Sequence, residues 1–161
     1  MDSQSLNELL KQVVIDTLRT MANLEFETLD RLPDSAFHNP GFAGQVHILG
    51  DWHGTVTLQC SEALGLRLAE VMLPQVLPTQ DMMTDLIREL TNMIGGNLKA
   101  QLGTRCILST PKAASVTTPQ PLPPETSDIA SIFFSCEGEL LLVRILESTL
   151  DLGSELAELP D

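Results

Sequence analysis

Positive charge is scarce in this chain of 161 residues. Nine Lys and Arg residues stand against 22 Asp and Glu, which gives a net charge of −13. A phosphate backbone repels such a chain, so the composition argues strongly against a nucleic-acid-binding function. Anionic membrane surfaces are disfavoured for the same reason.

Long hydrophobic runs and cysteine motifs are also missing. The longest wholly apolar stretches span a few residues, such as 140–143, so we predict no transmembrane helix. The first residues have no basic segment followed by an apolar run, and we expect no secretory signal. The three cysteines, Cys60, Cys106 and Cys136, are too widely spaced for a disulfide framework or a zinc motif. These absences predict a cytoplasmic protein with reduced thiols and no metal site.

The remaining composition is that of a folded domain. Hydrophobic residues make up 43% of the chain and charged residues 19%. We predict a single domain over residues 1–147, because a chain of this length buries a substantial core without disulfides. The last residues, 148–161, are acidic and contain no Lys or Arg, and are predicted to form a solvated tail.

Apolar residues at helical spacing predict two long amphipathic helices, over residues 5–23 and 81–102. Gly103 is expected to end the second. A shorter helix is predicted to begin after Ser61, a favourable N-cap residue, and to run to Leu73.

Alternating and β-branched residues predict six strands. They span residues 24–32, 43–49, 55–60, 104–110, 128–136 and 139–147. Residues 34–41 and the proline-rich segment 111–127 are predicted to be loops. A helix followed by three strands occurs twice. We therefore predict an α+β fold in which a pseudo-repeat of helix plus three strands forms a largely antiparallel six-stranded sheet covered by long helices.

The predicted helix 81–102 has two contrasting faces, because each residue advances a helix by about 100°. The apolar face, predicted to pack on the core, consists of Met83, Leu86, Ile87, Leu90, Met93, Ile94 and Leu98. Asn97 falls on this face, so we expect its amide to be buried and hydrogen-bonded. The opposite, polar face consists of Asp85, Arg88, Glu89, Asn92, Gly96 and Lys99.

Two features of the polar face are unusual. Glu89 and Asn92 are i,i+3 neighbours, so their side chains lie side by side. The helix also continues through Gly95 and Gly96, at about 1 kcal/mol per glycine relative to alanine. Such glycines require a reason, such as the close approach of another backbone or another protein. From the spacing alone, a solvated face remains the favoured interpretation over a catalytic one.

The run from Asp85 to Lys99, DLIRELTNMIGGNLK, is similar to the signature D-x3-E-x2-N-x3-G-N-x-K of the CheX-type chemotaxis phosphatases, within the wider CheC/CheX/FliY group. Every specified position of that signature is matched. The segment 44–61 resembles the hairpin G-x-[IV]-x-[IFL]-x-G-x3-G-x-[VI] of the same family. The resemblance extends over about residues 37–147 and implies a CheC/CheX-like fold.

The resemblance implies a phosphatase, a hydrolase that removes the phosphoryl group from the aspartate of a CheY-like response regulator. Asn92 would orient the attacking water, and Glu89 would bind a lysine of the regulator. The other residues of the polar face would contact the partner: Asp85, Arg88, Gly96 and Lys99. Any Mg²⁺ would belong to the regulator, so we expect no cofactor on this chain.

The resemblance also bears on the number of sites and on assembly. The predicted helix 5–23 has no E-x2-N motif, which favours one site per chain and the CheX-like branch. The family implies a homodimer formed through the sheet. The alternative is a non-catalytic response-regulator-binding or flagellar-switch-like module. The pathway is either chemotaxis or another two-component system.

The predicted turn between strands 43–49 and 55–60 carries further candidates. His47 and His53 flank it, but no third metal ligand is within reach, so ordinary strand and turn residues are the favoured interpretation. Trp52 at the turn is expected to pack over the edge of the core rather than to anchor a partner.

Overall fold

The computed structural model describes residues 2–31, 41–103, 105–116 and 126–148. In these ranges the helices are α1 (Ser3–Ala22), α2 (Glu62–Met72) and α3 (Gln80–Leu102). The strands are β1 (Glu27–Leu29), β2 (Gly41–Gly50), β3 (Gly54–Ser61), β4 (Cys106–Leu108), β5 (Lys112–Val116), β6 (Thr126–Cys136) and β7 (Glu139–Ser148). The predicted tail, apart from residue 148, and the greater part of the predicted loop 34–41 lie outside the described residues.

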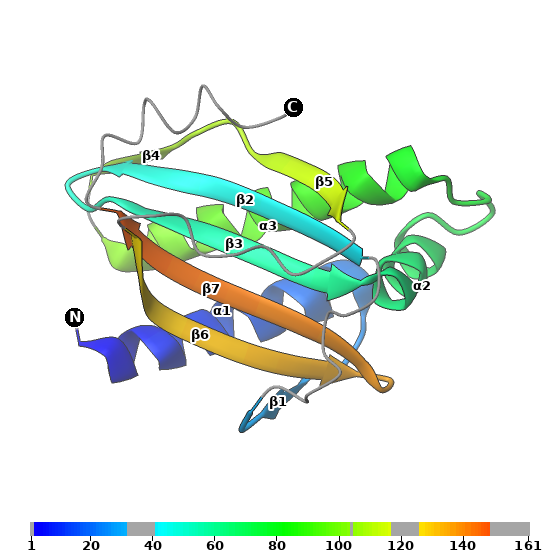
Figure 1. Cartoon of the computed structure of the whole chain (residues 1–161), viewed down its shortest axis with the longest axis horizontal. Helices are drawn as coiled ribbons and strands as arrows, with labels where there is room; N and C mark the ends of the chain where they lie inside the picture. Colours follow the sequence, from blue (N-terminus) through cyan, green and yellow to red (C-terminus); the bar gives the residue numbers. More distant parts are fainter. Residues whose placement is uncertain (1, 32–40, 104, 117–125, 149–161) are drawn as a thin grey trace.

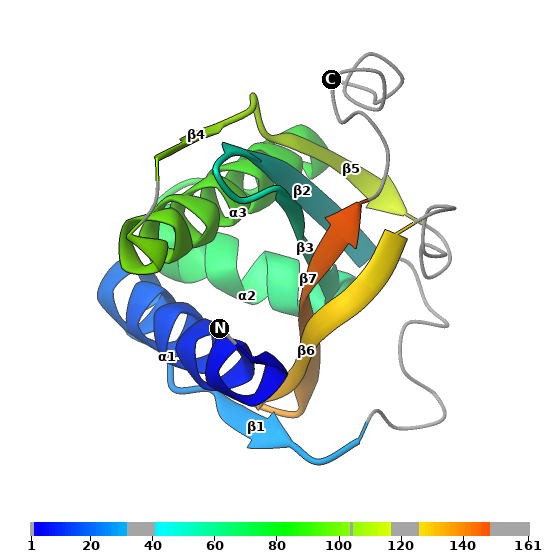
Figure 2. The same ribbon diagram turned by 90° about the vertical axis from the view of Figure 1, so that its left-hand side faces the viewer.

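All three helices pack on the same face of one curved antiparallel sheet (Figure 1 and Figure 2). The strand order is β1-β6-β7-β3-β2-β4, and β5 also pairs with β2. The predicted α+β class, with an antiparallel sheet covered by helices, is confirmed.

The sheet order reflects the predicted repeat of helix plus strands. The hairpin β2–β3 and the hairpin β6–β7 meet at the centre, where β3 pairs with β7. At the edges the halves exchange strands: β1 of the first half pairs with β6, and β4 and β5 of the second half pair with β2. Each half therefore needs strands of the other half to pair with its own edge strands.

The sheet has seven strands within the described residues, one more than predicted. The additional strand, β5, lies at the start of segment 111–127, which we predicted to be a loop, and β6 also begins inside that segment. The sequence Lys-Ala-Ala-Ser-Val has weak strand propensity, since Ala and Lys are depleted in strands. The strand forms because β4 pairs with residues 48–50 of β2 and leaves residues 41–45 of that edge for β5. The remainder of the predicted loop, residues 117–125, lies outside the described residues.

The helices begin and end close to the predicted positions. The hydroxyl of Ser61 accepts a hydrogen bond from the backbone N–H of Leu64 at 3.1 Å and caps α2. At the start of α3, Thr79 caps the N–H of Met82 in the same way, at 3.2 Å. Gly103 ends α3 with a φ of +67°, in the left-handed region that favours glycine.

Two glycines allow α3 to approach β2 closely. A Cβ at Gly95 would lie 2.6 Å from Cγ1 of Val46, and a Cβ at Gly44 would overlap the hydroxyl of Thr91. That hydroxyl is held in place, because it donates to the carbonyl of Ile87 over 2.7 Å. The close contact on β2 fixes the side of α3 that faces the sheet.

The β2–β3 turn is closed by Trp52, whose indole ring covers Gly54 so tightly that a Cβ there would overlap it. Trp52 is half-buried and packs against the hydrophobic core, as predicted. None of the described helices is long and apolar enough to cross a membrane.

Candidate functional site

The polar face of α3 lies on the surface of the molecule. Glu89 is exposed and Asn92 is half-buried, one helical turn apart on the same side of the helix. The apolar residues Leu86 and Leu90 turn away from this face and are buried. The helix thus presents a carboxylate and an amide side by side at its surface.

Three of the five functional side chains on the polar face have no partner among the residues that the structure describes. Asp85 and Arg88 form an ion pair with each other. Within the described residues, Glu89, Asn92 and Lys99 form no side-chain hydrogen bond or ion pair. Their hydrogen-bonding capacity is available to solvent or to another molecule.

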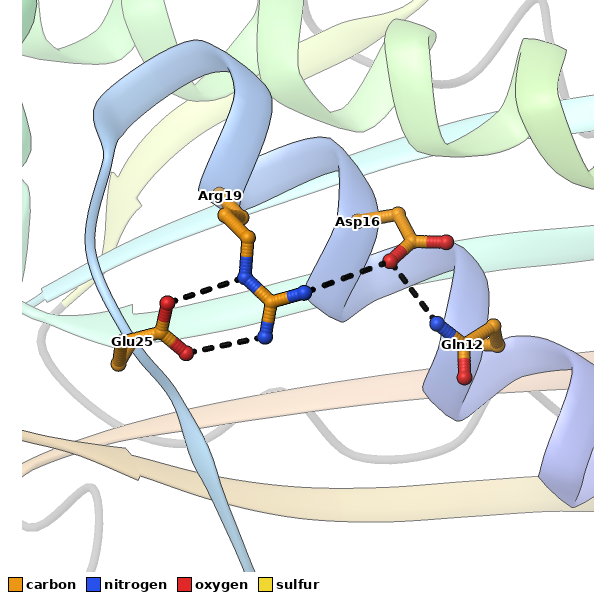
Figure 3. Close-up of polar contacts among 4 residues, drawn as sticks. All are labelled: Gln12, Asp16, Arg19 and Glu25. Atoms are coloured by element: carbon orange, nitrogen blue, oxygen red, sulfur yellow. Dashed lines mark hydrogen bonds and ion pairs between the residues drawn. The ribbon is translucent and has the colours of Figure 1, made fainter.

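The exposed side of α1 is different (Figure 3). Arg19 forms a two-pronged ion pair with Glu25, with both N···O distances at 3.0 Å. Asp16 accepts a hydrogen bond from the side-chain amide of Gln12 at 2.8 Å and lies 3.9 Å from Arg19. These polar groups satisfy one another within α1 and the segment that follows it.

Two residues predicted for the buried face of α3 lie elsewhere. Met93 is half-buried and Asn97 is exposed, so the prediction of a buried Asn97 was wrong. Both line a groove of about 260 Å³ between α1 and α3, and α1 contributes Thr17 and Met21 to it. The reason is positional: Met93 and Asn97 lie where the apolar and polar faces of α3 meet, and α1 covers this edge incompletely. The amide of Asn97 still has a partner, because it donates to the Thr17 hydroxyl at 2.9 Å.

The paired glycines of α3 have different surroundings. Gly95 faces β2, where only a hydrogen in place of a Cβ fits against Val46. At Gly96, a Cβ would contact Leu108 of the described residues at an ordinary 3.7 Å. Packing therefore accounts for Gly95 but not for Gly96, which lies on the polar face.

His47 is an internal residue of the sheet, with 2% of its surface exposed. Its Nδ1 lies 2.8 Å from the Thr55 hydroxyl, and its Nε2 lies 3.3 Å from the side-chain amide of Gln45. Burial lowers the pKa of His47 to about 4, so the ring is neutral near pH 7. His53 is exposed. Among the described residues, no group of three or more His, Cys, Asp and Glu side chains is placed to hold a metal ion.

Two of the cysteines are core residues. Cys60 and Cys136 are buried, and burial raises the pKa of the Cys60 thiol to about 12. Thiols with raised pKa values are poor nucleophiles near neutral pH. The polar face of α3 is therefore a better candidate for a functional site than either of them.

Comparison with known families identifies the family of this chain. The family model described as chemotaxis phosphatase CheX matches residues 42–135, more than half of the chain, and the match includes α3, β3 and all of β2 except Gly41. The chain belongs to the CheX family. No curated protein matches it.

Solved structures of similar fold include CheX proteins and the FliM middle domain. Chemotaxis protein CheX from Vibrio vulnificus is 24% identical, with a TM-score of 0.73, over 91% of this chain and 99% of that one. The CheX of the CheX-CheY-BeF3-Mg²⁺ complex from Borrelia burgdorferi is 18% identical, with a TM-score of 0.66, over 88% of this chain and 97% of that one. The FliM middle domain from H. pylori is 9% identical, with a TM-score of 0.58, over 96% of each chain. At these identities the structures support the fold of this CheX-family chain.

Proposed function

We propose that this CheX-family chain is a cytoplasmic phosphatase that hydrolyses the aspartyl phosphate of a CheY-like response regulator. The observation that carries the proposal is the pair Glu89 and Asn92, adjacent on the surface of α3 and without partners among the described residues. Two facts support it: the family is one of chemotaxis phosphatases, and a structurally similar CheX has been crystallised with CheY, BeF3 and Mg²⁺.

The proposed reaction requires little covalent chemistry from the enzyme. An aspartyl phosphate is an activated acyl phosphate. A water oxygen bonds to phosphorus, the bond from phosphorus to the aspartate oxygen breaks, and the electron pair remains on the regulator's carboxylate. The products are aspartate and inorganic phosphate. Phosphoryl transfer of this kind depends mainly on positioning and electrostatics, so an oriented water is the chief contribution of the enzyme.

Asn92 is suited to orient that water. The amide oxygen of Asn92 accepts a hydrogen bond from the water and holds it in line behind the phosphorus. The amide carries no net charge and does not repel the anionic phosphoryl group, as a carboxylate would. A glutamine performs a comparable water-positioning task in GTPases.

Glu89 is suited to a different task, because its carboxylate accepts hydrogen bonds from a cation. In the proposal Glu89 binds a lysine of the regulator's phosphorylation site and fixes α3 against it. Removing one partner of a buried interfacial charge pair costs about 2–5 kcal/mol of binding. The reaction then needs no nucleophile from this chain.

The rest of the polar face contacts the regulator in this proposal, through Asp85, Arg88, Gly96 and Lys99. Gly96 supports this role, because packing within the described residues does not require a glycine there. The chain has no cofactor of its own in the proposal, and Mg²⁺ belongs to the regulator. The presence of Mg²⁺ in the CheX-CheY complex from Borrelia supports this assignment.

The assembly and the boundaries of the protein form part of the proposal. Residues 1–147 make up a single CheX-like domain with an acidic tail at 148–161, and two copies pair through their sheets, as the family resemblance implies. Light scattering coupled to gel filtration tests the pairing. A mass of about 35 kDa, twice 17.6 kDa, supports the homodimer, and a mass near 17.6 kDa rejects it.

The alternative function is a non-catalytic module that binds a regulator or belongs to a flagellar switch. The observation in favour of this alternative is that the FliM middle domain has a fold similar to that of this chain. The presence of Glu89 and Asn92 on the surface favours the phosphatase.

A turnover assay distinguishes the two functions. Several purified receiver domains are phosphorylated with acetyl phosphate, freed of it, and mixed with one-twentieth of a molar equivalent of this protein. We expect phosphate release from at least one receiver to exceed one turnover per chain. Binding without accelerated release from any receiver would support the module instead.

A further inference from the structure

A hydrogen bond joins α3 to α1 close to the proposed site. The side-chain amide of Asn97, five residues after Asn92, donates to the Thr17 hydroxyl of α1 at 2.9 Å. Asn97 is exposed, whereas Thr17 has 4% of its surface exposed. Thr17 is therefore too deeply buried to contact a partner protein.

This bond holds α3 from a side that the sheet does not reach. With about 100° per residue, Thr91 and Gly95 lie about 200° and 240° around α3 from Glu89, and both face β2. Asn97 lies about 80° from Glu89, on the side of α1. Contacts from two directions thus hold the helix and leave the arc with Glu89 and Asn92 free.

The rotation of α3 about its axis decides where its side chains point. Side-chain tips lie about 5–6 Å from a helix axis, so a rotation of about 10° moves them by about 1 Å. A misplacement of about 1 Å at a reacting group costs up to about 100-fold in rate. A contact that prevents a small rotation of α3 is consequently important for a reaction that depends on one oriented water.

We propose that Asn97 and Thr17 are positioning residues, whose hydrogen bond fixes the rotation of α3 and thereby aims Asn92 and Glu89. The inference rests on the proposed phosphatase function. It assigns a role to α1, which has no E-x2-N motif of its own, and it explains why an exposed amide lies on the boundary of the apolar face.

The first test compares three variants of α1. Thr17→Val keeps the shape of the side chain but removes the hydroxyl, and Thr17→Ser keeps the hydroxyl. Thr20→Val is the matched control, because Thr20 lines the same groove and makes no side-chain hydrogen bond within the described residues. Steady-state kinetics on a phosphorylated receiver should show kcat reduced about tenfold in Thr17→Val with KM within about twofold. Thr17→Ser and Thr20→Val should remain near wild type.

A double-mutant cycle with Asn97→Ala distinguishes positioning from direct contact. If the hydrogen bond acts through α3, Thr17→Val and Asn97→Ala lower kcat to a similar extent, and the double variant is no worse than either. A decrease in Asn97→Ala alone would mean that Asn97 itself contacts the regulator. That result would overturn the proposal, as would additive effects, which indicate a general loss of packing.

A second measurement does not depend on activity. The side-chain amide resonance of Asn92 in a ¹H–¹⁵N spectrum reports its surroundings directly. We expect it to shift in Thr17→Val and to return in Thr17→Ser, with no shift in Thr20→Val. An unmoved resonance in Thr17→Val would overturn the positioning role. Inactivity of the wild type towards every receiver would instead reject the proposed function and leave this readout to decide the positioning role.

Discussion

The two long helices have matching places in the two halves of the chain, yet their surfaces differ in chemistry. α1 packs against β6 and α3 against β2, and these strands lie at equivalent positions on either side of the central β3–β7 pair. On α1, Gln12 pairs with Asp16, and Arg19 pairs with Glu25 of the segment that follows the helix. On α3, Glu89 and Asn92 have no partner within the described residues.

The comparison separates what the fold needs from what a function needs. A helix that covers one end of this sheet requires an apolar stripe, and both helices have one. The fold does not require an adjacent carboxylate and amide that lack partners, since those of α1, Asp16 and Gln12, hydrogen-bond to each other. The surface pair Glu89 and Asn92, without partners among the described residues, is therefore better explained by a task performed on another molecule.

The strongest test removes an amide from each helix. Asn92→Ala and Asn92→Asp should each lower dephosphorylation about 100-fold, or about 2.7 kcal/mol of barrier, because the water is no longer held or is held by a repelling charge. Gln12→Ala on α1 should leave the rate unchanged. The decay of regulator phosphate measures all three. Full activity in Asn92→Ala would remove Asn92 from the mechanism.

Reversing one charge on each helix tests the docking role of Glu89. Glu89→Lys should weaken binding to a receiver loaded with a phosphate mimic about 30-fold, or about 2 kcal/mol, because two cations then meet. Glu8→Lys makes the same change on an exposed residue of α1 and should alter the affinity less than twofold. Calorimetric titration measures both, and equal affinities for the two variants would contradict the role of Glu89.

A third comparison concerns the hairpins. The β2–β3 hairpin of the first half contains a titratable side chain, the buried and hydrogen-bonded His47. The β6–β7 hairpin of the second half pairs apolar residues, such as Phe133 with Leu142. The folded state lowers the pKa of His47 from 6.5 to about 4, so its contribution to stability is present above pH 6.5 and is lost as the pH falls. The free energy of unfolding should drop by about 1.3 kcal/mol between about pH 7.5 and pH 5.5.

Urea denaturation at the two pH values measures this drop. His47→Gln should remove most of it, whereas His53→Gln, at an exposed residue, should retain it. An unchanged drop in His47→Gln would assign the pH dependence to other groups.

The smallest expected effects distinguish the two glycines of α3. In Gly95→Ala the new methyl group collides with Val46, and the cost of about 1–3 kcal/mol outweighs the gain of about 1 kcal/mol in helix propensity. In Gly96→Ala the new methyl group makes an ordinary 3.7 Å contact with Leu108, so the variant should be more stable by up to about 1 kcal/mol while binding the receiver more weakly. Thermal unfolding and titration measure the two effects. Destabilisation by both variants would show that Gly96 also serves the fold.

The periodic parts of the structure could be predicted, and the irregular parts could not. Helix α3 was predicted to within one residue, because its apolar spacing and Gly103 are strong local signals. Strand β5 was missed, because it forms against an edge of β2 that the sequence does not reveal. The predicted site residues lie together on the surface of α3, and their roles stay predictions.

Thr17 could not have been assigned any role from the sequence. Its bond to Asn97 joins residues that are 80 positions apart, and no local pattern specifies which α1 residue faces which α3 residue. The same limit explains why the burial of Asn97 was predicted wrongly. The helical period placed Asn97 on the apolar face, but it does not show how far α1 covers that face.

The order of residues along this chain was sufficient to specify a helix with an apolar side and a polar side, and to place Glu89 and Asn92 one turn apart on the latter. This follows because helical period and capping are local properties. The folded structure alone shows which sides of α3 are held. Gly44 and Gly95 allow one side to pack closely on β2, and Thr17 of α1 bonds to another. Such contacts depend on the mutual fit of distant segments, which is set when the core closes around them.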